Sequence, residues 1–507
     1  MSSTIRSSRS LTIAMALALC AATLFAAQPA PAQGGGQGGG RGGRGGGSGF
    51  SQRDTTPPRD LGPKSPLPTG RVTYRTLIET NIELERIAAA YPDRVKRFAL
   101  PNRSLLGQTV WALEISHNVN ASAWKPAFLM TGLQHSREWP TVDLTMEFVN
   151  DILMNDRTDA RISQLLDNAR LLVVPVVNPD GYEMSRTLLI EQKRRNCRVE
   201  DGKVPTFADC ANPTNRMTGV DLNRNYAAFW GGSGASVSPK GDSYRGAAPF
   251  SEPEVRNIRD LMATNQIVVA LSNHTPDERV LRAPSAVEEP VPADIIVYDS
   301  LAQALGRDLN WRAGPWPEIY YTASGTMEEF AYYTAGTLSF TFENTPGGRG
   351  FHPAYPFVVD QYTGTGAYPG SNARNAFMRL LEATTNPALH SVLKVKAPAG
   401  AILTISKRFD IESSPLLKSD NRADSLARDP AIRIPTSITS TLTVPVGASE
   451  VTWHVNPSLR ASQHEQAFLQ ESWTLSCSSD GKTQSTLVKV ARGETANVDM
   501  RACGRGK

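Results

Sequence analysis

Four short stretches rich in apolar and β-branched residues constrain the fold of this sequence more than any other feature. They cover residues 127–131, 171–177, 267–271 and 338–342. A strand that is apolar on both faces is typical of a parallel sheet covered by helices. Apolar residues with helical spacing over residues 76–89 and 142–154 supply such helices. The sequence therefore predicts an α/β fold, with a mixed, mostly parallel twisted sheet flanked by helices.

Polar and charged side chains follow these predicted strands closely. Four of them carry groups suited to catalysis or metal binding: His135, Glu138, His274 and Glu343. Ligands of open α/β sheets bind outside the carboxyl ends of the strands. We therefore expect these four side chains to lie together at one edge of the sheet.

The spacing of His135 and Glu138 lets an imidazole and a carboxylate turn toward one metal ion. Two histidines and one carboxylate, with the fourth position left to water, form a hydrolytic zinc site. His274 is the best candidate for the second histidine, because it follows a predicted strand. The sequence thus predicts one bound Zn2+ ion. Surface or loop positions are expected for the remaining histidines, which are His117, His352, His390, His454 and His464.

The N-terminal region predicts export. Arg6 and Arg9 precede an apolar run over residues 11–27, and residues 30–32 form an A-x-A cleavage site. We interpret residues 1–32 as a signal peptide, since the run is too short and too small in its side chains for a membrane anchor. A secreted or periplasmic location, without stable membrane insertion, is expected.

The number of cysteines is consistent with an exported chain. A lipid anchor at Cys20 is the less favoured alternative, because Leu19 is larger than the residue usual before such a cysteine. The other four are Cys197, Cys210, Cys477 and Cys503. Four cysteines in an exported chain suggest two disulfides, and pairing neighbours in sequence joins Cys197 to Cys210 and Cys477 to Cys503. Neither pair has the C-x-x-C spacing of a zinc site.

Composition separates two further regions. Residues 33–70 are rich in glycine and proline and predict a flexible tether, with an RGG-type RNA-binding tail as the alternative. The net charge of +4 is small for 507 residues and does not indicate nucleic-acid binding. Short β-branched stretches separated by turns over residues 387–507 predict a β-sandwich-like accessory domain. This region holds no catalytic cluster, so a chain ending near Asn386 is expected to retain activity.

The order of several motifs resembles the zinc metallocarboxypeptidases of the carboxypeptidase A/B/T type, as an exported bacterial-type member. The motifs are HSRE at 135–138, NPDGY at 178–182, GVDLNRN at 219–225, the lone His274, YTASG at 321–325 and FTFE at 340–343. The resemblance extends over residues 74–382 and implies a catalytic domain at residues 71–386. It does not cover the C-terminal region.

The resemblance implies a role for each catalytic candidate. The three metal-binding candidates would hold the zinc ion, and Glu343 would be the general base. Arg194 would polarise the substrate carbonyl. Because Lys193 replaces the family's usual tryptophan before this arginine, Arg195 remains an alternative.

The resemblance also implies substrate-binding roles. The residues concerned are Asn223, Arg224, Tyr321, Arg137 and Glu328. Asn223 and Arg224 would clamp the terminal carboxylate of the substrate, since a guanidinium offers a planar fork of donors. Tyr321 matches the family's mobile tyrosine, with Tyr320 as the adjacent alternative. Arg137 lies within the HSRE motif.

Glu328 matches the floor of the family's pocket for the departing side chain. A buried carboxylate is costly unless it is paired, so this match implies a preference for C-terminal Lys or Arg. The alternative is that Glu328 turns away and Glu329 or water satisfies the site. Asp221 is implied to hydrogen-bond the far nitrogen of His135 and fix its tautomer.

These observations favour an exported zinc exopeptidase that acts on the C-termini of peptides or proteins. A peptidase of cell-wall peptides is the alternative within the same chemistry. A non-catalytic binding module with a relic site is the alternative from another class. The presence of Glu343, Arg194 and both zinc histidines argues against that module.

Overall fold

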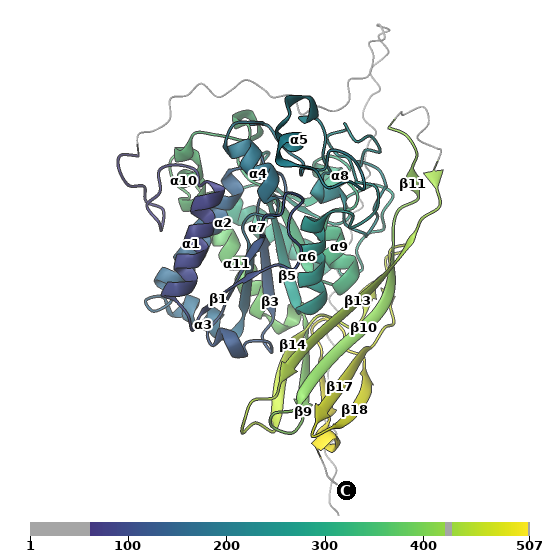
Figure 1. Cartoon of the computed structure of the whole chain (residues 1–507). Helices are drawn as coiled ribbons and strands as arrows, with labels where there is room; N and C mark the ends of the chain where they lie inside the picture. Colours follow the sequence, from purple (N-terminus) through teal and green to yellow (C-terminus); the bar gives the residue numbers. More distant parts are fainter. Residues whose placement is uncertain (1–60, 421–427, 505–507) are drawn as a thin grey trace, which may run out of the picture. The chain divides into compact units, whose positions relative to one another are not determined.

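The computed structural model describes residues 61–420 and 428–504. The predicted signal peptide and most of the predicted tether lie outside these residues. An eight-stranded sheet with the order β1-β2-β4-β3-β5-β8-β6-β7 forms the centre of the fold (Figure 1). Its strands are β1 (Val95–Ala99), β2 (Trp111–Ile115), β3 (Ala127–Thr131), β4 (Arg170–Val174), β5 (Ile267–His274), β6 (Arg279–Arg282), β7 (Arg312–Pro315) and β8 (Leu338–Glu343).

The four middle strands of this sheet are the four apolar stretches of the sequence. Strands β4, β3, β5 and β8 are mutually parallel, and each of their residues is buried. Antiparallel pairs flank them, with β2 beside β4 and β6 beside β8. The predicted mixed, mostly parallel sheet is confirmed. Strand β4 ends three residues earlier than expected, because Pro175 has no amide hydrogen for the ladder.

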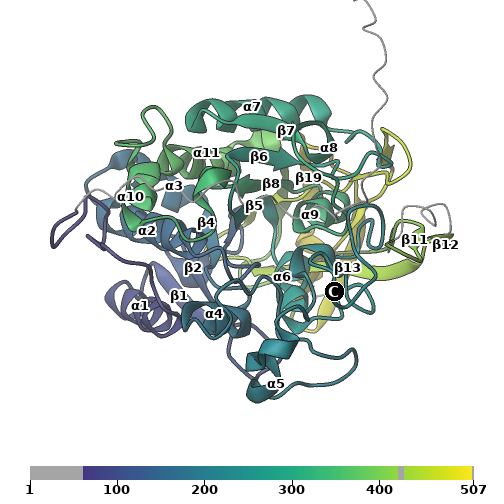
Figure 2. The same cartoon turned by 90° about the horizontal axis from the view of Figure 1, so that it is seen from above.

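Helices cover both faces of the sheet. Helices α2 (Pro140–Asn155), α7 (Ile295–Leu309) and α11 (Ala373–Thr385) lie on one face (Figure 2). Helices α1 (Leu77–Ala90), α6 (Pro253–Thr264) and α9 (Met327–Ala335) lie on the other. The remaining α-helices are α3 (Ala160–Asn168), α4 (Pro179–Arg186), α5 (Phe207–Ala211), α8 (Trp316–Ile319) and α10 (Tyr355–Thr363).

Local sequence signals explain where the first two helices begin. The side chain of Thr76 accepts a hydrogen bond from the amide of Glu79, and the Thr76 amide donates one to the Glu79 carboxylate, which caps α1. Pro140 opens α2, where its missing amide hydrogen costs nothing. The residues between β3 and α2 therefore form a short turn at the carboxyl end of the sheet.

The C-terminal region contains strand-rich sheets, as expected. A four-stranded sheet has the order β13-β10-β17-β18, and a three-stranded sheet has the order β14-β9-β19. The strands are β9 (Ser391–Lys396), β10 (Ile402–Glu412), β13 (Arg433–Thr443), β14 (Glu450–Val455), β17 (Trp473–Ser479), β18 (Lys482–Val488) and β19 (Thr495–Asp499). Buried residues of both sheets, including Leu403, Trp453 and Trp473, share one apolar core.

Both predicted disulfides are present, joining Cys197 to Cys210 and Cys477 to Cys503. His390 lies in the loop between Leu389 and Ser391, as expected, but it is not on the surface. Its side chain is buried, and its Nε2 lies 2.7 Å from Nδ1 of His454. The strand pairing of β9 and β14 brings these two histidines together from distant parts of the sequence. Among residues 61–420 and 428–504, no helix has both the length and the apolar character needed to cross a membrane.

Candidate metal centre and substrate site

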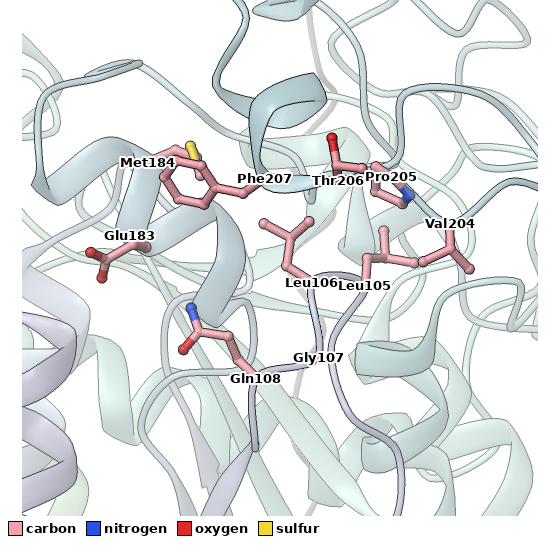
Figure 3. A pocket seen from close by; sticks show the side chains of 10 residues that line it. All are labelled: Leu105, Leu106, Gly107, Gln108, Glu183, Met184, Val204, Pro205, Thr206 and Phe207. Atoms are coloured by element: carbon pink, nitrogen blue, oxygen red, sulfur yellow. The ribbon is translucent and has the colours of Figure 1, made fainter.

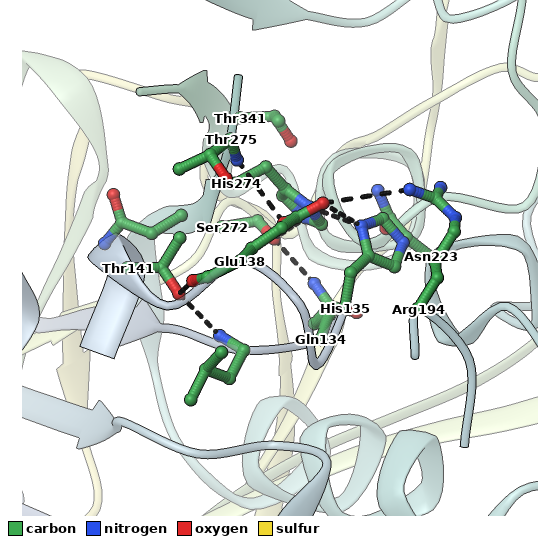
Figure 4. Close-up of polar contacts among 12 residues, drawn as sticks. Gln134, His135, Glu138, Thr141, Arg194, Asn223, Ser272, His274, Thr275 and Thr341 are labelled. Carbon is green, nitrogen blue, oxygen red and sulfur yellow. Dashed lines mark hydrogen bonds and ion pairs between the residues drawn. The ribbon is translucent and has the colours of Figure 1, made fainter. Parts of the chain in front are cut away.

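The three predicted metal ligands converge at the carboxyl ends of β3 and β5. His135 and Glu138 lie between β3 and α2, and His274 is the last residue of β5. Nδ1 of His135 lies 2.8 Å from Oε1 of Glu138 (Figure 4). Nδ1 of His274 lies 3.0 Å from Nδ1 of His135 and 3.0 Å from Oε2 of Glu138. All three side chains are buried, and their ligand atoms lie within 4.8 Å of one another.

The outer nitrogen of each imidazole is already engaged, which turns both Nδ1 atoms inward. Nε2 of His135 lies 2.9 Å from Oδ1 of Asp221, and Nε2 of His274 lies 2.8 Å from Oγ of Ser272. With the proton on Nε2, each imidazole presents an Nδ1 lone pair to the centre of the cluster. The two Nδ1 lone pairs and the Glu138 carboxylate are close enough together to bind one cation between them. This donor set fits zinc.

The charge states of these side chains agree with metal binding. Burial alone would raise the pKa of Glu138, but the imidazoles of His135 and His274 hold it well below its usual range. Burial lowers the pKa of His274 to about 4, and a neutral imidazole is the form that ligates a metal. The amide of Thr275 donates a hydrogen bond to Oε2 of Glu138 at 3.3 Å, which helps to orient the carboxylate.

Glu343 lies beside the cluster on the neighbouring strand. It is the last residue of β8 and is the register partner of His274 in the parallel β5–β8 pair. Its side chain is only 4% exposed. Burial and the nearby Glu138 carboxylate raise the pKa of Glu343 well above its usual range. A carboxyl group with raised proton affinity is suited to accepting a proton from a water molecule.

The two arginines that the sequence left as alternatives point to different places. Nη2 of Arg194 donates to Oδ2 of Asp221 at 2.8 Å, and its Nη1 lies 3.7 Å from Oε1 of Glu138. Arg195 instead donates to the carbonyl oxygen of Gly241 at 2.5 Å. Arg194 is therefore the arginine beside the metal ligands.

Asn223 and Arg224 lie in a short 3-10 helix, η3 (Leu222–Arg224). Oδ1 of Asn223 accepts a hydrogen bond from the amide of Met327 at 2.9 Å, which fixes the orientation of the Asn223 side chain. Among the described residues, nothing accepts a hydrogen bond from the buried Nδ2 of Asn223. Nε of Arg224 donates to the carbonyl oxygen of Gly234 at 3.1 Å. An unpaired buried donor next to a guanidinium is suited to bind an anion such as a carboxylate.

One carboxylate links this pair to the metal ligands. Oδ1 of Asp221 accepts hydrogen bonds from Nε2 of His135 at 2.9 Å and from the amide of Asn223 at 3.0 Å. Its second oxygen holds Arg194. The orientations of the metal ligand, the arginine and the anion-binding residues are thus set by the same side chain.

The remaining substrate-binding candidates differ in exposure. Tyr321 is 41% exposed, and its ring centroid lies 5.9 Å from the guanidinium carbon of Arg224. The hydroxyl of Tyr320 is committed to a hydrogen bond with the Asp277 carboxylate. Nε of Arg137 is buried and has no hydrogen-bond partner among the residues that the structure describes. Tyr321, rather than Tyr320, therefore has a side chain free to contact a substrate.

Glu328 is fully buried within the same region. Its Oε2 accepts a hydrogen bond from Oγ1 of Thr341 at 3.0 Å, and its Oε1 lies 3.4 Å from Oγ of Ser285. Burial raises the pKa of this carboxyl group. Glu329 turns instead toward the start of α9, where it accepts a hydrogen bond from the amide of Thr326. The Oγ1 of Thr341 therefore pairs with Glu328, whereas the amide of Thr326 pairs with Glu329.

Sequence reasoning missed Ser272, which orients His274. The signal was present, because residues two apart on a strand point to the same face, and Ser272 precedes His274 by two positions on β5. Ser272 also accepts a hydrogen bond from Nε2 of Gln134 at 2.6 Å. Figure 4 shows both polar side chains beneath the candidate ligands.

A separate cavity of about 550 Å³ lies away from these residues (Figure 3). It is lined by Leu105, Leu106, Gly107, Gln108, Glu183, Met184, Val204, Pro205, Thr206 and Phe207. None of these residues is a predicted site residue. The metal cluster, and not this cavity, is therefore the candidate functional site.

Comparison with known proteins agrees with this geometry. Residues 80–362 match the profile of the Peptidase M14 family, described as zinc carboxypeptidase. The chain therefore belongs to the zinc carboxypeptidase family. The family's metal agrees with the predicted cofactor, for which His135, Glu138 and His274 form a possible site.

Individual relatives are similar over part of their length. Carboxypeptidase A2 of Rattus norvegicus is 32% identical over 277 residues, which are 53% of this chain and 62% of that protein. Carboxypeptidase B of Bos taurus is 29% identical over 286 residues, which are 55% of this chain and 63% of that protein. This chain thus spans less than two thirds of either curated relative.

A solved structure shows the same fold. The crystal structure of carboxypeptidase A from Helicoverpa armigera aligns with a TM-score of 0.51 and 24% sequence identity. The alignment covers 62% of this chain and 74% of that chain. The expected carboxypeptidase-like α/β fold is therefore confirmed.

Proposed function

We propose that this protein is an exported zinc metallocarboxypeptidase that hydrolyses the C-terminal peptide bond of peptides and proteins. The observation that carries the proposal is the anion-binding pair beside the candidate metal ligands. Nδ2 of Asn223 is buried and lacks an acceptor among the described residues, and Arg224 lies next to it. A terminal carboxylate would supply acceptors for both side chains. An internal peptide bond carries no such charge, so the arrangement favours an exopeptidase.

The chemistry follows from the side chains around the cluster. When bound, a zinc ion supplies Lewis-acid chemistry and lowers the pKa of a water molecule to about 7. Asn223 and Arg224 hold the terminal carboxylate and so place the last peptide bond at the metal site. The Glu343 carboxylate accepts a proton from the attacking water and passes it to the leaving amine nitrogen. Arg194 donates a hydrogen bond to the carbonyl oxygen as negative charge builds on it.

Tyr321 and Arg137 are further residues that bind the substrate in this proposal. Tyr321 is partly exposed and lies near Arg224, so its ring can cover a bound C-terminal residue. Arg137 retains an unpaired buried Nε among the described residues and can donate to the substrate backbone upstream of the cleaved bond. Both roles concern binding, and neither side chain transfers a proton.

A preference for C-terminal Lys or Arg is part of the proposal. Within the described residues, the hydrogen bonds of the buried Glu328 carboxylate come from the hydroxyl groups of Thr341 and Ser285. A carboxylate in such a position is stabilised more by a cation than by hydroxyl groups. The ammonium or guanidinium group of a departing residue is a suitable cation.

The proposal extends to the domains and to the location. Residues 71–386 are the catalytic domain, and residues 387–507 are a β-rich accessory domain. One Zn2+ ion is the cofactor, and nucleic acid is not a partner. Export by the signal sequence at residues 1–32 to the periplasm or medium is supported by the two disulfides, which persist in oxidising compartments.

The deciding experiment compares two peptides that differ only at the C-terminus. One ends in a free carboxylate and the other in an amide, and each is incubated with the purified zinc-loaded protein with and without a chelator. We expect the free acid to be cleaved at its last bond by the zinc-loaded protein alone. Equal cleavage of the amide would identify an endopeptidase or amidase instead, and cleavage that resists the chelator would exclude the metal.

A further inference from the structure

A glycine-rich loop lies between the candidate substrate site and the C-terminal region. The loop comprises residues 229–237, with the sequence FWGGSGASV, and we call it the glycine loop. Its inner side faces Arg224 and the YTASG motif that carries Tyr321. Its outer side faces an extension of the β10–β13 hairpin, of which the structure describes residues 412–420 and 428–429. Figure 1 shows β10 and β13 running from the C-terminal sheets past α6 toward this extension.

The inner contacts hold a predicted substrate-binding residue. The carbonyl oxygen of Gly234 accepts the hydrogen bond from Nε of Arg224 at 3.1 Å. Gly234 has φ +82°, and a Cβ there would lie 1.9 Å from the carbonyl oxygen of Thr322. A Cβ on Gly232 would lie 3.3 Å from Cβ of Ser324. The loop can lie this close to the site only because these positions lack side chains.

The outer contacts come from the hairpin extension, whose short strands are β11 (Leu416–Leu417) and β12 (Arg428–Asp429). The Asp420 carboxylate accepts hydrogen bonds from Oγ of Ser236 at 2.7 Å and from the amide of Val237 at 2.8 Å. The amide of Leu417 donates to the carbonyl oxygen of Gly231 at 2.9 Å.

Further contacts close the same interface. Nη2 of Arg428 lies 3.3 Å from Oγ of Ser233, whose amide donates to the Glu288 carboxylate at 3.0 Å. The amide of Phe229 donates to the carbonyl oxygen of Glu412 at 3.1 Å. The hairpin extension therefore contacts the glycine loop along its length, from Phe229 to Val237.

We propose that the hairpin extension is a positioning element of the substrate site, which holds the glycine loop and through it the guanidinium of Arg224. Three glycines give the loop many backbone conformations, and freezing them has a large entropic cost. The contacts from residues 412–420 and 428–429 stabilise one of these conformations, and the carbonyl of Gly234 in turn fixes the position of Arg224. The C-terminal region thus contributes to substrate binding although it holds no residue that touches substrate. The inference rests on the proposed function, because it assigns a role to the carboxylate clamp.

Three variants test the proposal in the full-length zinc-loaded protein. Asp420→Ala removes two hydrogen bonds to the loop, whereas Asp420→Asn keeps an acceptor for the Val237 amide and a donor for Ser236. Asp429→Ala is the matched control, because Asp429 lies on the same extension and its carboxylate pairs with Lys418 at 2.8 Å. The measurements are KM and kcat for a free-acid peptide, and amide hydrogen exchange of residues 231–235.

For Asp420→Ala we expect KM to rise roughly three- to tenfold with kcat nearly unchanged, together with faster exchange in the loop. Asp420→Asn and Asp429→Ala should behave like the unmodified protein in both measurements. Unchanged exchange in Asp420→Ala, or faster exchange with an unchanged KM, would overturn the inference. An equal fall in kcat for Asp420→Ala and the control would also overturn it, since that result indicates a general structural effect.

The failure of the proposed function is distinguishable from the failure of this inference. If the unmodified protein cleaves amidated and free-acid peptides equally, the clamp does not exist and the proposed function is wrong. The exchange measurement does not depend on peptide cleavage, so it still decides whether the hairpin extension holds the glycine loop.

Discussion

Nε2 of His135 lies 2.9 Å from Oδ1 of Asp221, so one buried carboxylate orients a candidate metal ligand. The same carboxylate accepts hydrogen bonds from the guanidinium of Arg194 at 2.8 Å and from the amide of Asn223 at 3.0 Å. Arg194, His135 and Arg224 together hold the pKa of Asp221 well below its usual range in spite of burial, so the carboxylate stays charged. The candidate metal ligand His135, Arg194 and the proposed carboxylate clamp are therefore joined through this side chain.

Asp221→Ala should weaken zinc binding without removing a ligand. Loss of an outer partner of a ligating histidine typically costs about 10- to 100-fold in metal affinity. Zinc affinity, measured by competition with a chelator, should fall by this amount. The matched control is Asp242→Ala, since Asp242 is exposed and lies 3.9 Å from Arg195. Equal zinc affinity in Asp221→Ala and the unmodified protein would show that His135 is oriented by other contacts.

His274→Ala and Glu343→Gln should separate metal binding from proton transfer. The first substitution removes a candidate ligand, so the purified protein should lose both zinc and activity. The second removes only the proton acceptor, so zinc should remain while turnover falls by about 100-fold or more. Metal analysis of the two purified variants checks the assignment. Absence of zinc from Glu343→Gln would make Glu343 a ligand rather than the base.

Arg224→Ala should act mainly on KM for free-acid peptides. Losing a hydrogen bond to a charged group costs about 1.5–3 kcal/mol, or roughly 10- to 150-fold in affinity. The exposed Arg216→Ala is the control, and its kinetics should match those of the unmodified protein. A KM that stays unchanged in Arg224→Ala would remove this residue from the carboxylate clamp.

Glu328→Gln should abolish the proposed preference for basic C-terminal residues. The substitution keeps the shape of the side chain but removes its charge and replaces one of its two acceptor oxygens with a donor. In the unmodified protein, kcat/KM should favour a peptide ending in Lys or Arg over one ending in Phe or Leu by about tenfold or more. Glu318→Gln changes an exposed glutamate of α8 and should leave this ratio intact. A preference of the unmodified protein for Phe or Leu would contradict the assignment of Glu328.

The contacting histidines His390, which is buried, and His454, which is partly buried, should make the folded protein sensitive to acid. Burial lowers the pKa of His390 to about 3 and that of His454 to about 4. An unfolded histidine titrates near about 6.5, so acid protonates the unfolded chain first. The contribution of the pair to the free energy of unfolding is therefore complete above this value and is lost as the pH falls toward 4.

Thermal unfolding midpoints at about pH 7 and about pH 5 measure this effect. The midpoint of the unmodified protein should fall between these two conditions, and His390→Gln should show a smaller fall. His464→Gln is the control, because the His464 side chain is 72% exposed. An identical pH dependence in His390→Gln and the unmodified protein would contradict the role of the pair.

Local sequence patterns were sufficient to predict the middle of the fold. The strands β3, β4, β5 and β8 are buried on both faces, and full burial leaves a continuous apolar signal. The edge strand β1 is partly exposed and includes Lys96 and Arg97, so periodicity did not identify it. The predicted ends of these strands also located the candidate ligands. A histidine or glutamate that directly follows a buried strand has few positions available other than the edge of the sheet.

Local sequence patterns could not predict contacts between residues that are distant in sequence. Nothing near Asp420 indicates that its carboxylate binds Ser236 and the amide of Val237, since the contact depends on how the hairpin crosses the catalytic sheet. The burial of His390 depends likewise on the register of β9 against β14. The domain boundary near residue 387 stays a prediction, and the composition on which it rests gave no indication of the contacts across it.

The parallel pairing of β19 with β9 has a consequence for the order in which the chain folds. All eight strands of the catalytic sheet precede residue 344, so this sheet can form while the C-terminal residues are still being synthesised. The three-stranded sheet needs β19, so it can form only after Thr495–Asp499 has been synthesised. Pairing between segments so far apart in sequence is slow, because the intervening chain must first be closed into a loop. The C-terminal region therefore completes its three-stranded sheet later than the eight-stranded sheet can form.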